Sequence, residues 1–367
     1  MVRQVLRTGS CALAAALTAL AFTASPFASA ATTPLVPGAV KTIPGKVDPT
    51  AVACPPGAAV AATTCDVLGS TSTSNQVNQV TDSNPKPGVV VAGGGDVACM
   101  TATTCLVVGE SSQQKGTLIW LKNGHVSKSV ALKNSSYLLG ATCTTTTCIV
   151  TGEVYGKPTK TGTPTFGVIA VVAESQSSPT AVRVAGVGVV NAVACASPTS
   201  CYAVGSTTGT TTGVAVLVPV THGRIGARRL VSGSDALDRI SCGTALSCWA
   251  TGTAYSAHAG VTTVIFPVTN GKAGTKVAGP PIGGAISCIS ATTCFFASGT
   301  SQYGKGKVDE LSNGRVVRSV VIPKFAYGSL SSIVCPTATA CLATGATGFH
   351  NPGPSYYYTG AVVTLHV

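Results

Sequence analysis

The chain has 367 residues, of which only 9% are charged, yet Lys and Arg outnumber Asp and Glu by 23 to 11, giving a formal net charge of +12. No stretch approaches 18 uninterrupted apolar residues, so the sequence excludes a membrane-spanning helix. The positive charge admits anionic polymers or nucleic acid as partners. Aromatic residues are not interleaved with the basic ones, however, which argues against nucleic acid.

The first 30 residues have the pattern of a secretory signal peptide. Arg3 and Arg7 precede an apolar run from Ala12 to Phe22, and the segment ends in Ala28-Ser29-Ala30. We therefore expect cleavage after Ala30 and a protein that is secreted to the extracellular space. A single domain is expected over residues 31–367.

Beyond residue 50 a short cassette recurs seven times: a β-rich segment, a cysteine, about five small polar residues, a second cysteine and then a glycine. A period near 47 residues indicates a repeat architecture, with one four-stranded sheet per repeat. In an exported chain the close pairs predict seven disulfides and no free thiol once Cys11 has left with the signal peptide. No metal site is expected, because no histidine stands beside a pair and the spacing is not that of zinc ligands. The predicted bridges are Cys54–Cys65, Cys99–Cys105, Cys143–Cys148, Cys195–Cys201, Cys242–Cys248, Cys288–Cys294 and Cys335–Cys341.

Residues 191–206, NAVACASPTSCYAVGS, show how one repeat is built. An alternating strand meets a turn rich in Ser, Pro and Thr, and a second strand ends at Gly205. A variable loop and two further strands follow, and the last two are joined by Asn-Gly or a similar pair, which is a strong hairpin signal. These tight turns are Asn123-Gly124, His222-Gly223, Asn270-Gly271 and Asn313-Gly314.

The two ends of the chain complete each other. The last repeat stops after its third strand, and the segment VPGAVKTIPGKVDPT before the first cysteine matches a fourth strand with its connector. We therefore predict an all-β fold: a seven-bladed β-propeller of four-stranded antiparallel blades, with one disulfide per blade. Residues 38–46 should pair with residues 359–366 and close the ring in the last blade. A monomer is expected.

The cassette resembles the cysteine-paired repeats of secreted propeller proteins from GC-rich Gram-positive bacteria, within the superfamily that holds YVTN-type and neuraminidase-repeat propellers. The likeness covers nearly all of residues 34–367 and rests on the C-x5-C-x3-G cassette. The S-x-D-x-G-x-T-W box of true sialidase repeats does not occur, so no sialidase chemistry is carried over. The G-H…W-D pattern is also missing.

Basic residues concentrate in the fourth strands and the tight turns before them. Lysine and arginine on an exposed edge strand discourage pairing with another chain, and this is the reading we favour. The alternative roles for these basic residues are binding of an anionic wall polymer and binding of nucleic acid. The residues are Lys41, Lys46, Lys122, Lys128, Arg224, Arg228, Arg229, Lys272, Lys276, Arg315 and Arg318.

Tyrosines fall in the loops after the second strands and in the connectors between blades, which emerge on the same face of a propeller. Their large amphipathic rings suit sugar stacking or a protein interface. The alternative is that they pack their own loops. We predict a ligand face to which Tyr155, Tyr255, Tyr303 and Tyr357 contribute most.

Glu110 and Glu153 both follow the cassette glycine, in neighbouring repeats. They should project toward the same face as the tyrosines, about 10 Å apart, near the wide end of the carboxylate spacing in inverting glycosidases. Hydrogen bonding to loop backbone is the simpler reading, and a calcium or ligand contact is a third. We include both residues in the predicted ligand-binding set.

No catalytic residues and no cofactor are assigned. The spacing yields no Ser-His-Asp constellation, and the glycine-rich AGGGD at 92–96 lacks the helix of a phosphate-binding loop. A cysteine nucleophile is excluded if all fourteen exported cysteines are paired, as expected. The first hypothesis is a non-catalytic binding propeller that recognises an extracellular or cell-envelope glycan or protein. The second is a propeller glycoside hydrolase or lyase that uses Glu110 and Glu153. A purely structural role in the envelope is a third.

Overall fold

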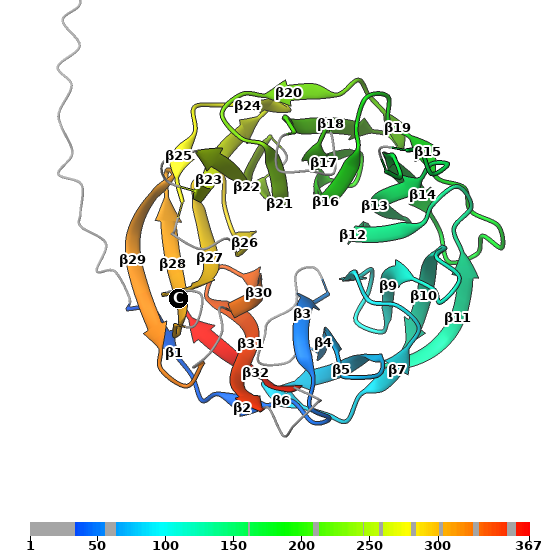
Figure 1. Ribbon diagram of the computed structural model, residues 1–367. Coiled ribbons are helices and arrows are strands. Elements are labelled where there is room, and N and C mark those ends of the chain that lie inside the picture. The colour runs from blue at the N-terminus through cyan, green and yellow to red at the C-terminus, as the bar shows by residue number, and fades with distance from the viewer. Residues whose placement is uncertain are drawn as a thin grey trace, which may run out of the picture. The chain divides into compact units, whose positions relative to one another are not determined.

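The computed structural model describes residues 34–55, 64–160, 162–207, 213–244, 246–256, 260–279, 284–300, 304–325, 330–350 and 357–367. The proposed signal peptide lies outside these ranges. Within them, every regular element is a strand, and the strands form seven antiparallel sheets. Figure 1 shows these sheets arranged as blades around a common axis.

Each blade begins with an inner strand that leads to the disulfide turn and a second strand that runs back. The inner strands are β3 (Asp48–Ala53), β8 (Asp96–Cys99), β12 (Tyr137–Cys143), β16 (Val189–Ser197), β21 (Ala236–Thr244), β26 (Ala285–Cys288) and β30 (Leu330–Thr337). The second strands are β4 (Thr64–Ser70), β9 (Thr104–Glu110), β13 (Cys148–Tyr155), β17 (Ser200–Ser206), β22 (Ser247–Ser256), β27 (Thr293–Gly299) and β31 (Ala340–His350).

A third strand and an outer strand complete each blade. The third strands are β5 (Asn75–Thr81), β10 (Gly116–Lys122), β14 (Thr165–Val172), β18 (Ala215–Thr221), β23 (Gly260–Thr269), β28 (Gly306–Ser312) and β32 (Tyr357–His366). In blades 1 to 6 the outer position is held by β6 (Asn84–Pro85) and β7 (Val89–Val91), β11 (His125–Ala131), β15 (Val182–Arg183), β19 (Arg224–Ile225) and β20 (Arg229–Val231), β24 (Lys272–Ala273) and β25 (Val277–Ala278), and β29 (Arg315–Ile322).

The ring is closed in the last blade as predicted, although the pairing begins at Val36 rather than at residue 38. The strands β1 (Val36–Pro37) and β2 (Lys41–Thr42) both pair with β32, in the registers Val36↔His366 and Lys41↔Val362. The inner strands contact one another in sequence and the seventh, β30, contacts the first, β3. The prediction of a seven-bladed propeller with one disulfide per blade is therefore confirmed.

The outer strand is continuous in blade 2 (β11) and blade 6 (β29), but it is interrupted or reduced to two residues in the other blades. In blades 4 and 5 a proline of the third strand favours the interruption, because a proline cannot donate to the ladder. The carbonyls of Pro219 and Pro267 accept bonds from Gly226 N (2.8 Å) and Gly274 N (2.7 Å), so the missing N–H of each proline also lies on the outer side. The outer strand breaks at this point and resumes a few residues later.

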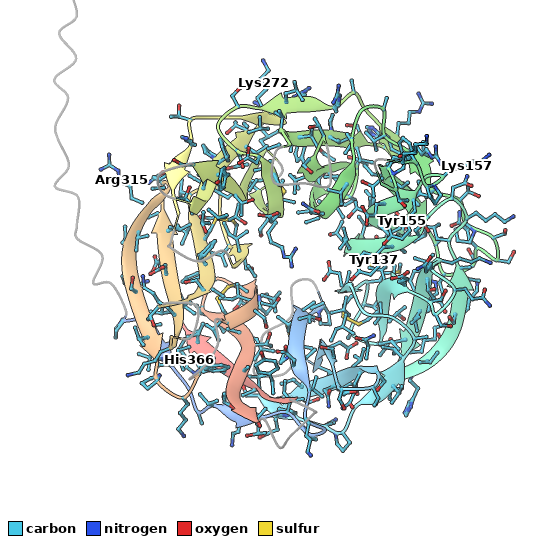
Figure 2. All side chains as sticks on the ribbon, viewed as in Figure 1. Tyr137, Tyr155, Lys157, Lys272, Arg315 and His366 are labelled. Carbon is cyan, nitrogen blue, oxygen red and sulfur yellow. A yellow bond between two sulfur atoms is a disulfide. The ribbon has the colours of Figure 1, made fainter. Side chains whose placement is uncertain are left out.

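Several basic residues of the outer edges join neighbouring blades. The ammonium of Lys128 in blade 2 donates to the carbonyls of Glu174 (2.6 Å) and Gln176 (2.7 Å) in blade 3. The guanidinium of Arg229 in blade 4 donates to the carbonyl of Gly271 in blade 5. Figure 2 shows other basic side chains, such as Lys272 and Arg315, projecting outward from the perimeter of the ring. The outer cations thus add inter-blade contacts to the edge protection expected of them.

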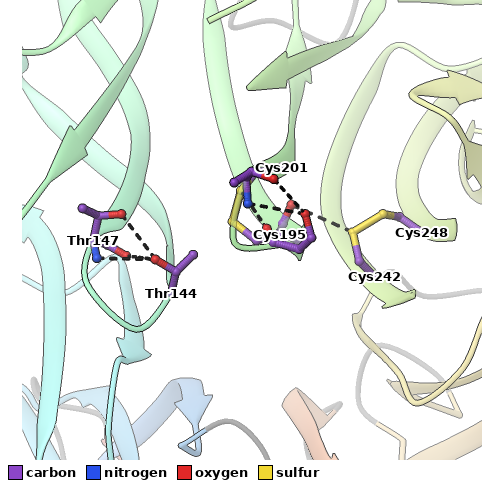
Figure 3. Close-up of a disulfide and its surroundings, with 9 residues drawn as sticks. Thr144, Thr147, Cys195, Cys201, Cys242 and Cys248 are labelled. Atoms are coloured by element: carbon purple, nitrogen blue, oxygen red, sulfur yellow. Dashed lines mark hydrogen bonds between the residues drawn. A yellow bond between two sulfur atoms is a disulfide. The ribbon is translucent and has the colours of Figure 1, made fainter. Parts of the chain in front are cut away.

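The seven predicted disulfides are all formed, with Cα–Cα distances of 3.8–4.2 Å. In Figure 3, Cys195–Cys201 joins two directly opposed strand positions, and Thr144 and Thr147 close the shorter turn of blade 3 with a backbone bond of 2.8 Å. The tight outer turn folds against the disulfide turn, since Asn123 N donates to Thr103 O at 2.8 Å. Asn123 has a φ of 51°, which asparagine tolerates better than most residues.

The cassette glycine allows the chain entering each inner strand to approach the second strand closely. A Cβ built on Gly205 would lie 2.0 Å from Val189 O, and one built on Gly152 would lie 2.0 Å from Tyr137 O. We therefore expect Gly205→Ala to lower the free energy of unfolding by about 1–3 kcal/mol, the usual cost of overpacking. Urea unfolding of the variant measures this, and a stability equal to that of the parent would contradict the steric explanation.

The residue after the second cysteine of a blade packs against the next blade. Trp249 donates from Nε1 to Ala291 O at 3.1 Å and lies under Gly314 of the next outer turn. In blade 1 the same position is Asp66, which is 3% exposed and has one carboxylate oxygen without a hydrogen-bond partner. Burial raises the pKa of Asp66 to about 6, although a hydrogen bond from Gln79 lowers it in part.

Asp66→Asn is expected to stabilise the protein at pH 8 and to have little effect at pH 4. The folded pKa of Asp66, about 6, is above its ordinary value of 3.8, so its favourable contribution is complete below pH 3.8 and is lost as the pH rises through 6. A difference of two pKa units corresponds to on the order of 3 kcal/mol at pH 8. Urea unfolding at both pH values tests this, with Asp82→Asn in an exposed turn as control. A gain of equal size at pH 4 would show that the charge is not the cause.

Candidate functional site

The strongest candidate site is a group of two carboxylates and two tyrosines on blades 2 and 3. Glu110 ends β9, and Glu153 lies near the end of β13. Tyr137 begins β12 directly opposite Glu153, and Tyr155 follows two residues after Glu153 on β13. Figure 2 shows Tyr137 and Tyr155 on the same part of the ring. We call these four residues the carboxylate–tyrosine cluster.

The four groups interact electrostatically. Burial raises the pKa of Glu153; a hydrogen bond with Tyr155 opposes this, and the charge of Glu110 adds to it. Burial also raises the pKa of Tyr137, and both carboxylates raise it further. The pKa of Tyr155 is raised by burial and then by Glu153 and Glu110. The charge of each carboxylate therefore reaches the other members of the cluster.

Backbone bonds and close glycine packing hold the cluster in place. Ser136 N donates to Glu153 O at 2.9 Å, and Tyr155 N donates to Ser136 Oγ at 3.0 Å. A Cβ on Gly93, which has a φ of 91°, would lie 2.4 Å from Glu110 O. The irregular segment 92–95, which leads into β8, is thus packed closely beside Glu110.

The cluster is accessible enough to meet a ligand. Tyr155 is 36% exposed, and Glu110, Tyr137 and Glu153 are half-buried. Ionised carboxylates accept hydrogen bonds, and tyrosine adds a hydroxyl and an apolar ring face. Such a set can bind polyhydroxylated molecules.

The structure brings together only part of the predicted ligand set. Glu110, Glu153 and Tyr155 meet, and Tyr137 joins them although it is not in that set. Tyr255 is 61% exposed but belongs to β22 in blade 5. Tyr357 begins β32 in blade 7, opposite His350, and its side chain is outside the described part of the structure. Tyr303 also lies outside the described residues.

The inner strands enclose a central cavity of about 160 Å³ that is lined by residues of all seven blades. Asp96 and Arg239 both line it. The two oxygens of Asp96 accept bonds from Val97 N (2.8 Å) and from Ala141 N of the next blade (2.9 Å). Burial is the main cause that raises the pKa of Asp96 to about 6, and its two backbone bonds and the charge of Arg239 oppose the rise. Asp96 therefore links two blades.

One group of potential metal ligands occurs among the described residues, and it does not suit a metal. The Asp66 carboxylate lies within 4.8 Å of the sulfurs of Cys99 and Cys105. These sulfurs are joined in a disulfide, so neither is a thiolate that could ligate a cation.

No protein-family model and no curated protein matches the sequence. Solved structures do match in fold. The WD40 β-propeller domain of Doa1 is similar with a TM-score of 0.57 and 12% identity, over 90% of this chain and 97% of that one. Hydrazine synthase of Kuenenia stuttgartiensis is similar with a TM-score of 0.59 and 12% identity, over 81% and 92% of the two chains. At this identity the similarity establishes the propeller fold alone.

The ranges that the structure describes contain no helix long and apolar enough to cross a lipid bilayer.

Proposed function

We propose that the chain is a secreted, non-catalytic binding propeller that recognises an extracellular or cell-envelope glycan or protein. The observation that carries the proposal is the carboxylate–tyrosine cluster. Secretion is supported by the pattern of residues 1–30 and by seven disulfides, which persist in oxidising compartments. The cassette's resemblance to secreted bacterial propeller repeats agrees with both.

A glycan fits the cluster best. Sugar hydroxyls donate hydrogen bonds to carboxylates, and the apolar face of a pyranose packs on an aromatic ring. The cluster supplies two such acceptors and two such rings within adjoining blades. The loop that follows Tyr155 carries two exposed lysines, Lys157 and Lys160, within five residues of the end of β13. They are further hydrogen-bond donors close to the cluster in sequence.

The alternative is a glycoside hydrolase or lyase that uses Glu110 and Glu153. One observation favours it: burial and the neighbouring Glu110 charge raise the pKa of Glu153. A carboxyl with a raised pKa beside a second carboxylate is the usual arrangement of a proton donor and its partner in glycosidases.

The decisive variant is Glu110→Gln/Glu153→Gln, examined on an array of wall and plant glycans. We expect the parent to bind a glycan without releasing products, and the variant to bind it at least roughly tenfold more weakly, since two hydrogen bonds to charged groups are lost. Thermal unfolding should change little, because neither side chain is fully buried. Glu174→Gln, which removes a surface carboxylate paired with Lys122, is the matched control.

Two results would reject the binding module. Product release by the parent that the variant lacks would establish the enzyme instead. Unchanged glycan binding by the double variant would show that the carboxylate–tyrosine cluster does not contact the glycan. A Tyr155→Phe variant, which keeps the ring and loses the hydroxyl, separates stacking from hydrogen bonding.

A further inference from the structure

Charge is distributed unevenly around the ring. Residues 175–308 contain nine basic residues and two acidic ones, whereas the chain as a whole has 23 and 11. The two acids, Asp235 and Asp238, lie beside and within the inner strand β21. Six of the basic residues lie in outer strands or the segments that flank them, in blades 3 to 5: Arg183, Arg224, Arg228, Arg229, Lys272 and Lys276.

A cleft of about 310 Å³ opens in this region, between the outer strands of blades 4 and 5. Arg229 and Ser232 line it from the β20 side, and Lys272 and Gly274 from the β24 side. Leu230, also in its wall, is 58% exposed. We call it the blade 4–5 cleft, and Figure 2 shows Lys272 on the perimeter of the ring.

The fold positions the cations that line the cleft, Arg229 and Lys272, and Lys276 beside it. The Arg229 guanidinium donates to Gly271 O across the blade boundary, and this single bond leaves most of its five N–H donors for other acceptors. The Lys276 side chain passes close to Gly233, its Cδ being 3.2 Å from the place of a Cβ there. Lys276 of blade 5 therefore reaches the blade 4 side of the same boundary.

No carboxylate neutralises these cations among the residues that the structure describes. The ion pairs found there join Lys122 with Glu174, Lys307 with Asp309 and Arg318 with Glu310. All three lie in blades 2, 3 and 6. The positive charge of Arg229, Lys272 and Lys276 is thus left for an external partner.

We propose that the blade 4–5 cleft binds an anionic polysaccharide that carries carboxylate or phosphodiester groups on successive units. A polyanion gains from several fixed cations at once, and guanidinium groups bind both kinds of oxyanion in a forked geometry. The exposed Leu230 offers an apolar contact for the sugar backbone between the charges.

The surface chemistry favours a polysaccharide over nucleic acid. Binding of single-stranded nucleic acid relies on aromatic rings on which bases stack. Tyr202, the aromatic that contacts the Gly271 turn, is only 7% exposed and lies beneath it. The cleft therefore offers charge and an aliphatic surface without a stacking platform. It is separate from the carboxylate–tyrosine cluster and has the opposite charge.

The test compares the parent with Arg229→Gln/Lys272→Gln/Lys276→Gln. The probes are polygalacturonate, poly(glycerol phosphate) and single-stranded DNA, titrated at several salt concentrations. We expect polygalacturonate and the phosphodiester polymer poly(glycerol phosphate) to bind the parent. The triple variant should bind both about tenfold more weakly or worse at low salt. The negative slope of log K against log salt should become less steep by about 2 when three contacts are removed.

A control variant removes the same number of charges elsewhere on the surface: Lys41→Gln/Lys115→Gln/Arg315→Gln, all exposed. It should retain nearly all of the affinity. Equal losses in the two variants would mean that net charge alone attracts the polyanions, and the proposal would be wrong. Tighter binding of DNA than of either other polymer would also overturn it. Arg229→Lys/Lys272→Arg/Lys276→Arg keeps the charges, and its binding checks that a loss in the triple variant is not a folding defect.

Discussion

Removal of residues 34–47 is expected to abolish cooperative unfolding near the parent's melting temperature. This segment carries β1 and β2, and with them Leu35, Ile43 and Val47, which are 9%, 1% and 0% exposed. Burying three such side chains contributes roughly 5–9 kcal/mol, which is comparable with the whole stability of a typical domain. The deletion also leaves β32 as an unpaired edge and exposes it to other chains.

Calorimetry and light scattering measure the two effects of this deletion. The matched control begins at residue 34 and keeps both closing strands, so it should melt as the parent does. Ile43→Asp offers a milder version, because it buries a charge in the core between the first and last blades. If the deletion variant melted cooperatively at the parent's temperature, the closing strands would not be needed to hold the ring together.

Complete reduction of the disulfides is expected to unfold the protein at room temperature. Each bridge closes a short loop, and a loop of about seven residues corresponds to roughly 2 kcal/mol on the chain-entropy model. Seven such bridges sum to roughly 15 kcal/mol, the upper end of the stability of ordinary domains. Circular dichroism with increasing dithiothreitol follows the loss of structure, and thiol titration of the untreated, unfolded protein should find essentially no free thiol in residues 31–367.

Removal of a single disulfide measures how much one bridge contributes to the free energy of unfolding. Cys242→Ser/Cys248→Ser should cost about 2 kcal/mol and leave a folded protein. The two cysteines of each bridge are buried or half-buried, so serine substitutions also bury two hydroxyl groups. The variant Cys242→Ala/Cys248→Ala lacks these hydroxyls, and comparing the two variants isolates the effect of losing the disulfide. A reduced protein that kept its full thermal stability would show that the hydrophobic contacts between blades suffice.

The architecture was readable from the sequence because its signals are local and repeated. A cysteine pair around a short turn, an Asn-Gly turn and a glycine at a constant offset each describe one hairpin, and their period gave the number of blades. The matching deficits at the two ends predicted the closing pairs, which the structure places at 36–37 and 41–42. The broken outer strands were not predictable in this way, because the effect of Pro219 depends on which neighbour its missing N–H faces.

In the candidate site, too, the repeated local positions could be read from the sequence, whereas contacts that depend on strand pairing could not. Glu110 and Glu153 were found because they occupy one repeated position in adjoining blades. Tyr137 was missed as a member of the cluster, since its place opposite Glu153 depends on cross-strand register. Tyr155 and Tyr255 also share one repeated position, but the ring places them two blades apart. A shared position in the repeat brings side chains together only when the blades are neighbours.

The short spacing within each cysteine pair also bears on how the correct bridges are chosen. Cys99 and Cys105 are separated by 6 residues, whereas the next cysteine, Cys143, is 38 residues beyond Cys105 (143 − 105). In an unfolded chain the probability that two residues meet falls as about the 3/2 power of their separation, so Cys105 meets its native partner roughly 15 times more often than it meets Cys143. Six of the seven pairs share this spacing or a closer one. Oxidation can therefore select the native pairing before any blade has folded, and the bonds then restrict each emerging hairpin to the register in which the ring is assembled.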